Sequence, residues 1–203
     1  MIHRNMTPRI YLVRHGETAW SLSGQHTSVT DIPLTDVGQR QARELGERLR
    51  DAQLAEVWSS PLQRARRTCE LAGFEEIMKL EPALTEWNYG EYEGVTSAEI
   101  RARQPRWNLF DDGCPGGESP EQVSHRADQV VARLRARGGN VALFSHGHFL
   151  RVLAARWIGL AARDGQHLLL QTASISILAS EHNNLTEPVI ALWNESSHAT
   201  KSS

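Results

Sequence analysis

Two histidines follow apolar runs that have the character of buried strands. The motif Arg14-His15-Gly16 comes after residues 9–13, and Ser145-His146-Gly147 comes directly after residues 141–144. Short, almost continuously apolar runs of this kind are typical of parallel strands buried on both faces. In such sheets the crevice at the carboxyl ends of the strands holds the active site. We therefore expect both histidines to face the same site.

A third predicted strand, residues 55–58, adds an arginine to this edge of the sheet. It leads through Ser59-Ser60-Pro61, which we expect to cap a helix with Pro61 at its first position, and Arg64 would lie one turn into that helix. A neutral imidazole can attack phosphorus and carry the phosphoryl group as a covalent intermediate. The guanidiniums of Arg14 and Arg64 would neutralise the non-bridging oxygens. The set suits a tetrahedral dianion.

Two further parts are needed for phosphoryl chemistry. The helix predicted to start near His146 would offer backbone donors to an anion at its N-terminus. An acid must protonate the leaving oxygen, and the irregular stretch 81–95 offers three candidates: Glu86, Glu91 and Glu93. The pair His146-x-His148 resembles half of a metal site, but no nearby Asp/Cys cluster completes it. We therefore predict no metal.

Each of these residues also has an ordinary structural explanation. A histidine after a strand is more often a satisfied core residue than a nucleophile. Arg64 shares its helix with Arg66 and Arg67, and an arginine-rich helix face is usually solvated. The glutamates of the 81–95 stretch are also common as plain loop charges. The conjunction of the features in one chain is what favours the catalytic interpretation.

The elements between these motifs alternate between strand and helix. Helical patterns begin at Thr35, Pro61, Thr96 and Ser119 and after His146, and further strands are expected at 77–80, 174–179 and 189–193. Residues 17–34 and 81–95 are irregular, and 111–120 form a turn region. Such alternation predicts an α/β fold, a three-layer α/β/α sandwich with a mostly parallel central sheet.

Composition sets broad limits on the class of protein. The chain has 203 residues, 40% hydrophobic and 23% charged, with a formal net charge of -2. These values are ordinary for a globular domain and argue against a nucleic-acid partner. We expect one domain over residues 9–194, with flexible tails at 1–8 and 195–203. No apolar run has the length of a membrane span, and the N-terminus lacks the apolar core of a signal peptide.

The cysteines and exposed apolar candidates bear on location and assembly. Cys69 and Cys114 do not make a disulfide framework, so we expect a reducing, cytoplasmic location. Trp157, Leu160 and the run 168–170 would suit either the core or the interface of a homo-oligomer. The sequence leaves these two alternatives open.

Four segments together resemble the successive signatures of the histidine phosphatase superfamily, which includes the phosphoglycerate mutases. They are Arg14-His15-Gly16-Glu17-Thr18, Ser60-Pro61-Leu62-Gln63-Arg64-Ala65, Glu86-Trp87-Asn88-Tyr89-Gly90 and Ser145-His146-Gly147-His148. Each segment alone is a weak signal, but the ordered set is specific, and the resemblance runs from about residue 9 to residue 193. It implies a phosphoglycerate mutase-like fold and an enzyme that needs no cofactor.

The resemblance also implies a role for each residue. His15 would be the phosphoryl-accepting nucleophile, and Glu86 would give a proton to the leaving group and then take one from the attacking water. Three residues would bind the phosphoryl oxygens: Arg14, Arg64 and His146. Arg64 is chosen among the arginines of its helix because it stands at the motif position.

The same residues could serve a phosphatase or a mutase. Phosphoglycerate mutases are generally longer after the segment that carries Glu86, whereas here one short helix leads to Gly116-Gly117-Glu118-Ser119. The usual mutase loop also has asparagines after its tryptophan, and this chain has Trp20-Ser21-Leu22-Ser23. Both differences favour a phosphatase that hydrolyses small phosphomonoesters. The alternatives are a phosphoglycerate mutase and, more distantly, an inactive module that binds phosphorylated ligands.

The loops resemble the sedoheptulose-bisphosphatase-like branch of the family, which implies a sugar phosphate or bisphosphate as the substrate. The similar segments are Ser23-Gly24-Gln25-His26-Thr27, residues 87–94 and Ser180-Glu181-His182-Asn183-Asn184. By that similarity five residues would contact the sugar or its distal phosphate: His26, Thr27, Tyr89, Arg151 and His182. From the sequence alone, His182 could equally be a surface residue and Arg151 a solvent-facing one.

Overall fold

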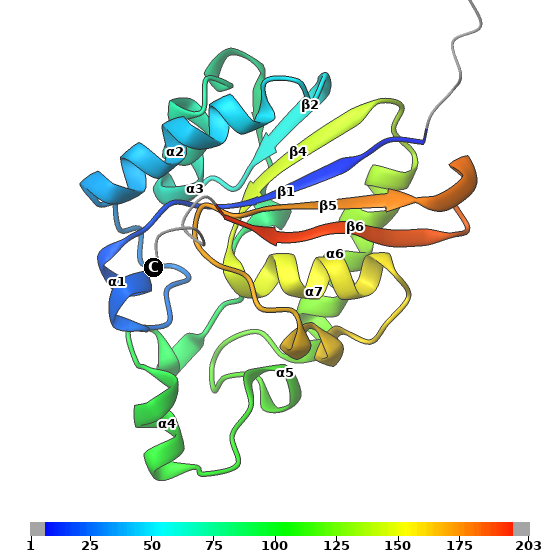
Figure 1. Ribbon diagram of the computed structural model, residues 1–203. Coiled ribbons are helices and arrows are strands. Elements are labelled where there is room, and N and C mark those ends of the chain that lie inside the picture. Colours follow the sequence, from blue (N-terminus) through cyan, green and yellow to red (C-terminus); the bar gives the residue numbers. More distant parts are fainter. Residues whose placement is uncertain (1–6, 197–203) are drawn as a thin grey trace, which may run out of the picture.

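The computed structural model describes residues 7–196, and its centre is a six-stranded sheet (Figure 1). The strands lie in the order β3 (Met78–Leu80), β2 (Leu54–Ser59), β4 (Asn140–Ser145), β1 (Ile10–Arg14), β5 (Ile175–Ser180) and β6 (Pro188–Glu195). The first four are parallel, β5 is antiparallel to β1, and β6 is antiparallel to β5. The predicted mostly parallel sheet is confirmed.

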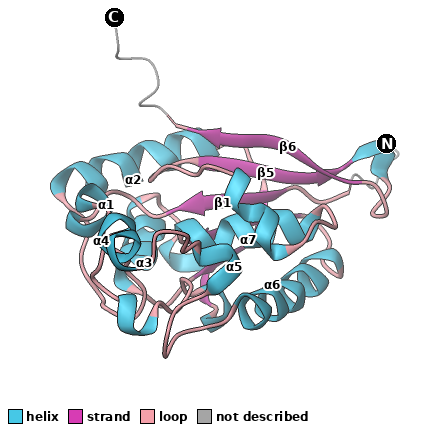
Figure 2. Ribbon diagram, turned by 90° about the horizontal axis from the view of Figure 1, so that it is seen from below, coloured by secondary structure: helices cyan, strands magenta, loops and turns pink. Residues whose placement is uncertain are grey.

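Side chains alternate between the two faces of the sheet. On β1 and β4, Leu12 and Leu143 belong to one apolar cluster, whereas Val13 and Phe144 belong to a second. Helices α6 (Pro120–Arg135) and α7 (Gly147–Trp157) cover the first face, and α2 (Asp36–Leu49) and α3 (Gln63–Leu71) cover the second. Figure 2 shows α6 and α7 together on one side of β1 and β5. The three-layer arrangement is therefore confirmed.

Helix starts follow the capping residues in the sequence. The side chains of Thr35, Thr96 and Ser119 each accept a backbone N–H from the first turn of the helix that follows. These are α2, α4 (Ser97–Arg103) and α6, the last with Pro120 at its first position. An oxygen that accepts one of the otherwise unpaired first-turn N–H groups stabilises a helix by about 1 kcal/mol.

The start of α3 differs from the prediction. The helix begins at Gln63, so Pro61 precedes it and Arg64 is its second residue. Leu62 stands at the N-cap with extended backbone and no side-chain cap. Ser60 lies outside the helix, where its hydroxyl accepts from the Leu62 N–H at 3.3 Å and also bonds the ring of His146.

The irregular stretches contain short helices that the sequence did not predict. Helix α1 (Ala19–Ser23) lies in the first, and α5 (Leu109–Asp112) overlaps the start of the predicted turn region. Short 3₁₀ segments lie elsewhere in the described residues: η1 (Glu75–Ile77), η2 (Pro82–Leu84), η3 (Gly90–Tyr92), η4 (Ala162–His167) and η5 (Glu181–Asn183). Helices of one turn leave too few periodic positions to be recognised from a sequence.

Several other predictions concern the ends and the surface of the chain. Of the predicted tails, residues 1–6 and 197–203 lie outside the described residues, and β6 continues one residue past the predicted domain end, to Glu195. Both cysteines are free and buried. Trp157 and Leu170 pack in the core, whereas Leu160 and Leu169 are exposed. No helix described between residues 7 and 196 combines the length and the apolar character needed to cross a bilayer.

A glycine pair fixes the loop after β1 against the start of α2. A Cβ on Gly16 would lie 2.5 Å from the Gly38 carbonyl oxygen, and a Cβ on Gly38 would overlap the backbone of Glu17. Neither clash involves a flexible side chain, so only backbone movement can relieve it. Glycine at both positions therefore lets the segment that carries His15 lie directly on the first turn of α2.

We predict that Gly38→Ala destabilises the fold by about 1–3 kcal/mol, since overpacking against backbone outweighs the higher helix propensity of alanine. Chemical denaturation should measure the change in the free energy of unfolding. Gly138→Ala is the matched control, because a Cβ there would meet no atom within 4 Å. Equal stability of the two variants would contradict the close approach.

Candidate active site

A cavity of about 210 Å³ opens where β1 ends and α7 begins. We call it the active-site cavity. Seven residues predicted from the sequence line it: Arg14, His15, His26, Thr27, Glu86, Tyr89 and Arg151. They come from the end of β1, both irregular stretches and α7. The sheet edge and the loops thus meet at one site, as the strand topology requires.

His15 is positioned by backbone bonds on both sides. Its N–H donates to the Ser145 carbonyl at 3.0 Å, and its carbonyl accepts from the Ala173 N–H at 3.0 Å. The ring nitrogen Nδ1 lies 2.7 Å from the Gly16 carbonyl oxygen. Because a carbonyl only accepts, Nδ1 carries the proton and Nε2 keeps its lone pair. Burial, with the charges of Arg64 and Arg14, holds the pKa of His15 well below its usual value.

His146 lies beside His15 in the opposite tautomer. The two ring centroids are 5.3 Å apart. Its Nδ1 accepts from the Nε–H of Arg64 at 3.2 Å, and its Nε2 lies 2.8 Å from the Ser60 hydroxyl. Nε2 therefore carries the proton. Burial, followed by the charge of Arg64, also holds the pKa of His146 well below its usual value, so both rings are neutral.

Arg64 and His146 are fully buried and stand behind the residues that line the active-site cavity. The guanidinium of Arg64 donates to three backbone carbonyls of the first irregular stretch: Thr27 at 3.1 Å, Ser28 at 3.1 Å and Thr30 at 3.2 Å. Carbonyl dipoles satisfy a buried cation that has no carboxylate partner. In this conformation Arg64 lowers the pKa of His15 through its charge and does not line the active-site cavity.

The two irregular stretches are joined through Glu93. Its carboxylate accepts from the N–H groups of Ser28 and Thr30, each at 2.9 Å, and from the Ser28 hydroxyl at 2.5 Å. Glu93 therefore orients the same peptide segment whose carbonyls hold Arg64. Of the three glutamates considered as acids, Glu93 is thus structural, and Glu91 does not line the active-site cavity.

Arg14 presents an unused donor at the cavity. One terminal nitrogen, Nη1, donates to the Leu170 carbonyl at 2.6 Å, whereas its buried Nε has no hydrogen-bond partner. The backbone of Gly147 lies against the guanidinium, because a Cβ there would come 3.2 Å from Nε. Glycine at that position therefore lets the first turn of α7 approach Arg14. A buried guanidinium donor without an acceptor is costly.

Glu86 occupies the N-terminus of α7. Oε1 accepts from the N–H groups of Trp87 and Phe149, both at 2.8 Å, and Oε2 accepts from His148 N–H at 3.0 Å. The positive end of the helix dipole favours a carboxylate there. The sequence-based prediction that these α7 donors face the anion is therefore corrected: two of them hold Glu86.

Tyr89, His148 and His26 form the wall of the cavity opposite the strand ends. The hydroxyl of Tyr89 lies 2.6 Å from His148 Nδ1, and the His26 ring packs 4.7 Å from Tyr89. Burial and the Glu86 charge raise the pKa of Tyr89 well above its usual value, so its hydroxyl donates to a His148 ring whose pKa is lowered by burial and by Arg151. His148 is therefore left with an Nε2–H donor.

His26 offers the complementary group. Its Nδ1 bonds the Val95 carbonyl at 2.7 Å, which leaves Nε2 as an acceptor. The Thr27 hydroxyl donates to the Gln25 carbonyl at 3.1 Å. Arg151 completes this side: it donates to the carbonyls of Gly165 and Gln166 while its guanidinium packs 4.7 Å above the Phe110 ring. The wall thus mixes neutral donors and acceptors with one cation.

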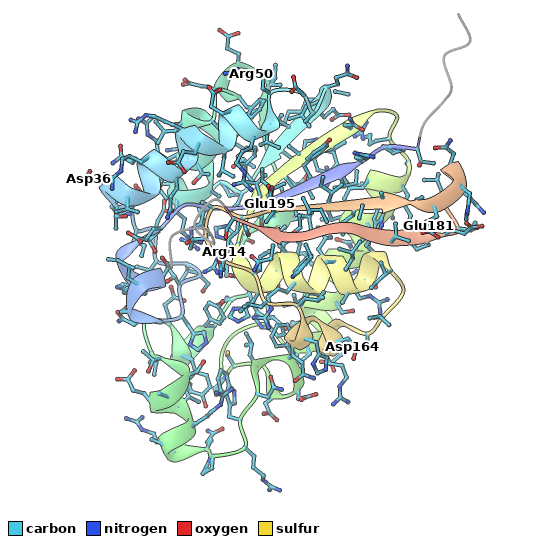
Figure 3. All side chains as sticks on the ribbon, viewed as in Figure 1. Arg14, Asp36, Arg50, Asp164, Glu181 and Glu195 are labelled. Atoms are coloured by element: carbon cyan, nitrogen blue, oxygen red, sulfur yellow. The ribbon has the colours of Figure 1, made fainter. Side chains whose placement is uncertain are left out.

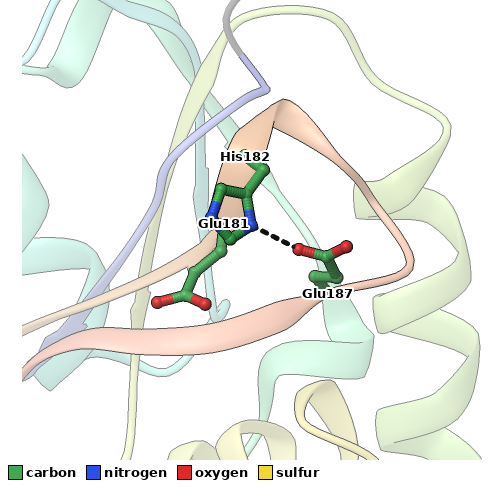
Figure 4. Close-up of side chains that lie close together, drawn as sticks. All are labelled: Glu181, His182 and Glu187. Atoms are coloured by element: carbon green, nitrogen blue, oxygen red, sulfur yellow. Dashed lines mark hydrogen bonds and ion pairs between the residues drawn. The ribbon is translucent and has the colours of Figure 1, made fainter.

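His182 does not belong to this site. It lies in the turn between β5 and β6, and its Nδ1 forms an exposed ion pair with Glu187 at 2.7 Å (Figure 4). Because β5 runs antiparallel to β1, that turn lies at the opposite end of the sheet, as the labels of Arg14 and Glu181 in Figure 3 show. The predicted contact between His182 and the substrate is therefore corrected.

Sequence reasoning also missed part of the cavity lining. The missed residues are Thr18, Trp20, Ser21, Gly24, Gln25, Ser97, Gly147, His148 and Leu170. His148 had a signal, since it stands two residues beyond His146 in the same motif. Leu170 had none, because nothing distinguishes an apolar residue of a distant loop from a core residue before its position is known.

Comparison with known proteins agrees with this geometry. Residues 10–196 match the histidine phosphatase superfamily (branch 1). An acid phosphatase of Mycobacterium tuberculosis is 43% identical over 178 residues, which cover 86% of this chain and 87% of that protein. A sedoheptulose 1,7-bisphosphatase of Saccharomyces cerevisiae is 31% identical, and the match covers 93% of each chain.

A solved structure supports the same assignment. The product of an open reading frame of Mycobacterium tuberculosis superimposes with a TM-score of 0.87 at 40% identity, covering 94% of this chain and 99% of that one. The predicted enzyme class, a phosphoric monoester hydrolase, is confirmed by the family match together with the phosphatase relatives. The chain, over nearly its whole length, belongs to branch 1 of the histidine phosphatase superfamily.

Proposed function

We propose that this protein is a metal-independent phosphatase that hydrolyses small phosphomonoesters through a phosphohistidine on His15. The observation that carries the proposal is the state of that ring: buried, neutral, and with its Nε2 lone pair unprotonated. An uncharged imidazole with a free lone pair is the reactive form of a histidine nucleophile. The guanidiniums supply the positive charge that a metal would otherwise provide.

The first step transfers the phosphoryl group to the enzyme. A bond forms between His15 Nε2 and phosphorus while the bond to the leaving oxygen breaks, and Glu86 gives its proton to that oxygen. Glu86 Oε2 carries the proton in this scheme, since it accepts one backbone N–H where Oε1 accepts two. The Gly16 carbonyl, bonded to Nδ1–H, stabilises the positive charge that the ring acquires.

The second step returns the enzyme to its starting state. Water attacks phosphorus, Glu86 takes the proton of that water, and the bond between nitrogen and phosphorus breaks to give inorganic phosphate and neutral His15. Arg14, which lines the cavity, binds a phosphoryl oxygen, and Arg64 and His146 support that side of the site from behind. Charge on the transferring group is stabilised in this way throughout.

The substrate class we propose is a sugar phosphate or bisphosphate. Opposite His15, the acceptor on His26, the donor on His148 and the hydroxyl of Tyr89 match the hydroxyl groups of a polyol. Arg151 suits a second anionic group. The S. cerevisiae relative, a sedoheptulose 1,7-bisphosphatase, supports the same class.

His15→Ala should abolish both turnover and covalent labelling. Quenching the wild-type enzyme in denaturant during turnover of a ³²P-labelled ester should trap acid-labile label, whereas the variant should trap none and lose at least about 10³-fold in kcat. His182→Ala is the matched control and should keep both properties, since His182 lies at the far end of the sheet. Full labelling of His15→Ala would exclude the mechanism.

The two central histidines should show opposite neutral tautomers by long-range ¹H–¹⁵N NMR at pH 6.5, with the proton on Nδ1 in His15 and on Nε2 in His146. A lowered pKa means that protonation requires a lower pH, so both rings should stay neutral as the pH falls from 7.5 to 6.5. His182 is the internal control. Its bond to Glu187 raises its pKa, so at pH 6.5 a larger fraction of His182 than of either central ring should be protonated. A charged His15 ring at pH 6.5 would contradict the proposal.

Phosphate release should be measured over sugar mono- and bisphosphates, three-carbon phosphoacids and an aryl phosphate. We expect the highest kcat/KM for a sugar ester. Tyr89→Phe should lower that value about 3- to 10-fold, the worth of one hydrogen bond, and leave the aryl phosphate unchanged. Isomerisation of 3-phosphoglycerate in the presence of a trace of bisphosphoglycerate would favour the mutase alternative instead. Binding of the esters without release would favour the inactive module.

A further inference from the structure

The backbone that carries Glu86 is held by an arginine outside the active-site cavity. Arg126 of α6 donates from Nη1 to the carbonyls of Ala83 at 3.0 Å and Thr85 at 2.7 Å, and from Nη2 to that of Glu86 at 3.3 Å. One side chain thus binds three carbonyls within four consecutive residues. Arg64 supports residues 27–30 of the first irregular stretch in the same way.

The remaining donors of Arg126 bind Glu118. Nε donates to Oε1 at 2.9 Å and Nη2 donates to Oε2 at 2.7 Å, a bidentate pair with both side chains largely buried. With five bonds, every N–H of the guanidinium has an acceptor. Glu118 in turn accepts from Asn88 N–H at 2.9 Å, and its carbonyl accepts from the Trp87 indole at 2.9 Å. The pair therefore holds residues 83–88 from both ends.

The guanidinium also couples this support to α7. It packs 4.4 Å from the ring centroid of Phe149, and the Phe149 N–H is a donor to Glu86 Oε1. Glu86 is consequently fixed twice: its carboxyl group by the N-terminus of α7, and its backbone by Arg126 on α6. A shift of either helix would move the carboxyl group relative to His15.

Arg126 and Glu118 have no access to the substrate. Neither lines the active-site cavity, and both line a separate cavity of about 350 Å³ that Glu86 also borders. Glu86 thus stands between the two cavities. Arg126 binds the backbone of Glu86 directly. Its charge also adds to burial and to Arg64 in lowering the pKa of His146. Lysine keeps that charge, so Arg126→Lys tests the position of Glu86, and its effect differs from a loss of substrate binding.

We propose that Arg126, with Glu118, is a positioning residue that fixes the distance between the Glu86 proton donor and the leaving oxygen. The inference rests on the proposed role of Glu86. Proton transfer requires the donor within hydrogen-bond distance of the leaving oxygen, and a displacement of about 1 Å can lower a rate about 10²-fold. Lysine cannot replace the arginine, because a single ammonium lacks the planar fork that binds several acceptors.

The test compares leaving groups. 4-Nitrophenolate leaves without protonation, whereas an alkoxide from glycerol phosphate needs a proton. Arg126→Lys should therefore lower kcat/KM for glycerol phosphate about 10- to 100-fold and for 4-nitrophenyl phosphate less than about 3-fold. In a Glu86→Gln background, Arg126→Lys should cause no further loss on glycerol phosphate, because the donor it positions is already absent.

Arg156→Lys is the matched control. Arg156 also forms a bidentate pair with a carboxylate, Asp128, and also binds one carbonyl, that of Leu160, but it does not contact the Glu86 segment. Arg156→Lys should leave kcat/KM for both substrates unchanged. Should Arg126→Lys fail to fold, Glu118→Gln should also lower kcat/KM more for glycerol phosphate than for 4-nitrophenyl phosphate. The loss should be smaller, since glutamine retains an acceptor for Asn88.

The outcomes distinguish a failure of the positioning role of Arg126 from a failure of the acid role of Glu86. An equal loss on both substrates in Arg126→Lys or Glu118→Gln, or a further loss in the Glu86→Gln background, would overturn the positioning role. If Glu86→Gln itself affected both substrates equally, the acid role in the proposed function would fail instead, whatever Arg126 did.

Discussion

The site depends on burying more positive than negative charge. Arg64 is fully buried beside two histidines, and its N–H groups meet carbonyl oxygens and an imidazole rather than a carboxylate. Among the residues that line the active-site cavity, two are arginines and only Glu86 is acidic. Neighbouring cations and burial keep both central histidines neutral. The active-site cavity and its surroundings thus hold an excess of positive charge that a phosphate dianion would neutralise.

That constraint explains why the loops around the site are held so tightly. Carbonyls stabilise a cation only if they stay aimed at it, and those of residues 27–30 are aimed by the Glu93 carboxylate from the second loop. The backbones of the loops pair as well, since His26 and Val95 bond at 3.0 Å. Long irregular stretches in a compact domain usually have a function. Here residues 26–30 and residues 93–95 bind one another through the Glu93 carboxylate and through backbone hydrogen bonds, so each stretch stabilises the conformation of the other.

The sequence predicts the fold and the candidate catalytic residues, because both depend on local sequence patterns. Strand ends mark His15 and His146, and the ordered motifs select Glu86 and Arg64. The error at His182 has a topological cause: an apolar run does not reveal its direction, and the antiparallel β5 carries its turn to the far end of the sheet. The start of α3 was also misplaced: Leu62 keeps an extended backbone before the helix, and the Ser60 hydroxyl bonds His146, a contact that no local pattern contains.

Arg126 illustrates a further limit of prediction from sequence. On a helix predicted to be amphipathic, an arginine is expected to face solvent, and nothing in its neighbourhood distinguishes it from Arg133 or Arg135. Its five acceptors come from segments that precede it by 8 to 43 positions. Since Glu86 takes its backbone position from α6 and its carboxyl orientation from α7, Glu86 is fixed by the helical layer, whereas His15 is fixed by the sheet. The geometry between the two residues therefore depends on how that layer packs on the sheet, so the core that stabilises the fold also sets the relative position of Glu86 and His15.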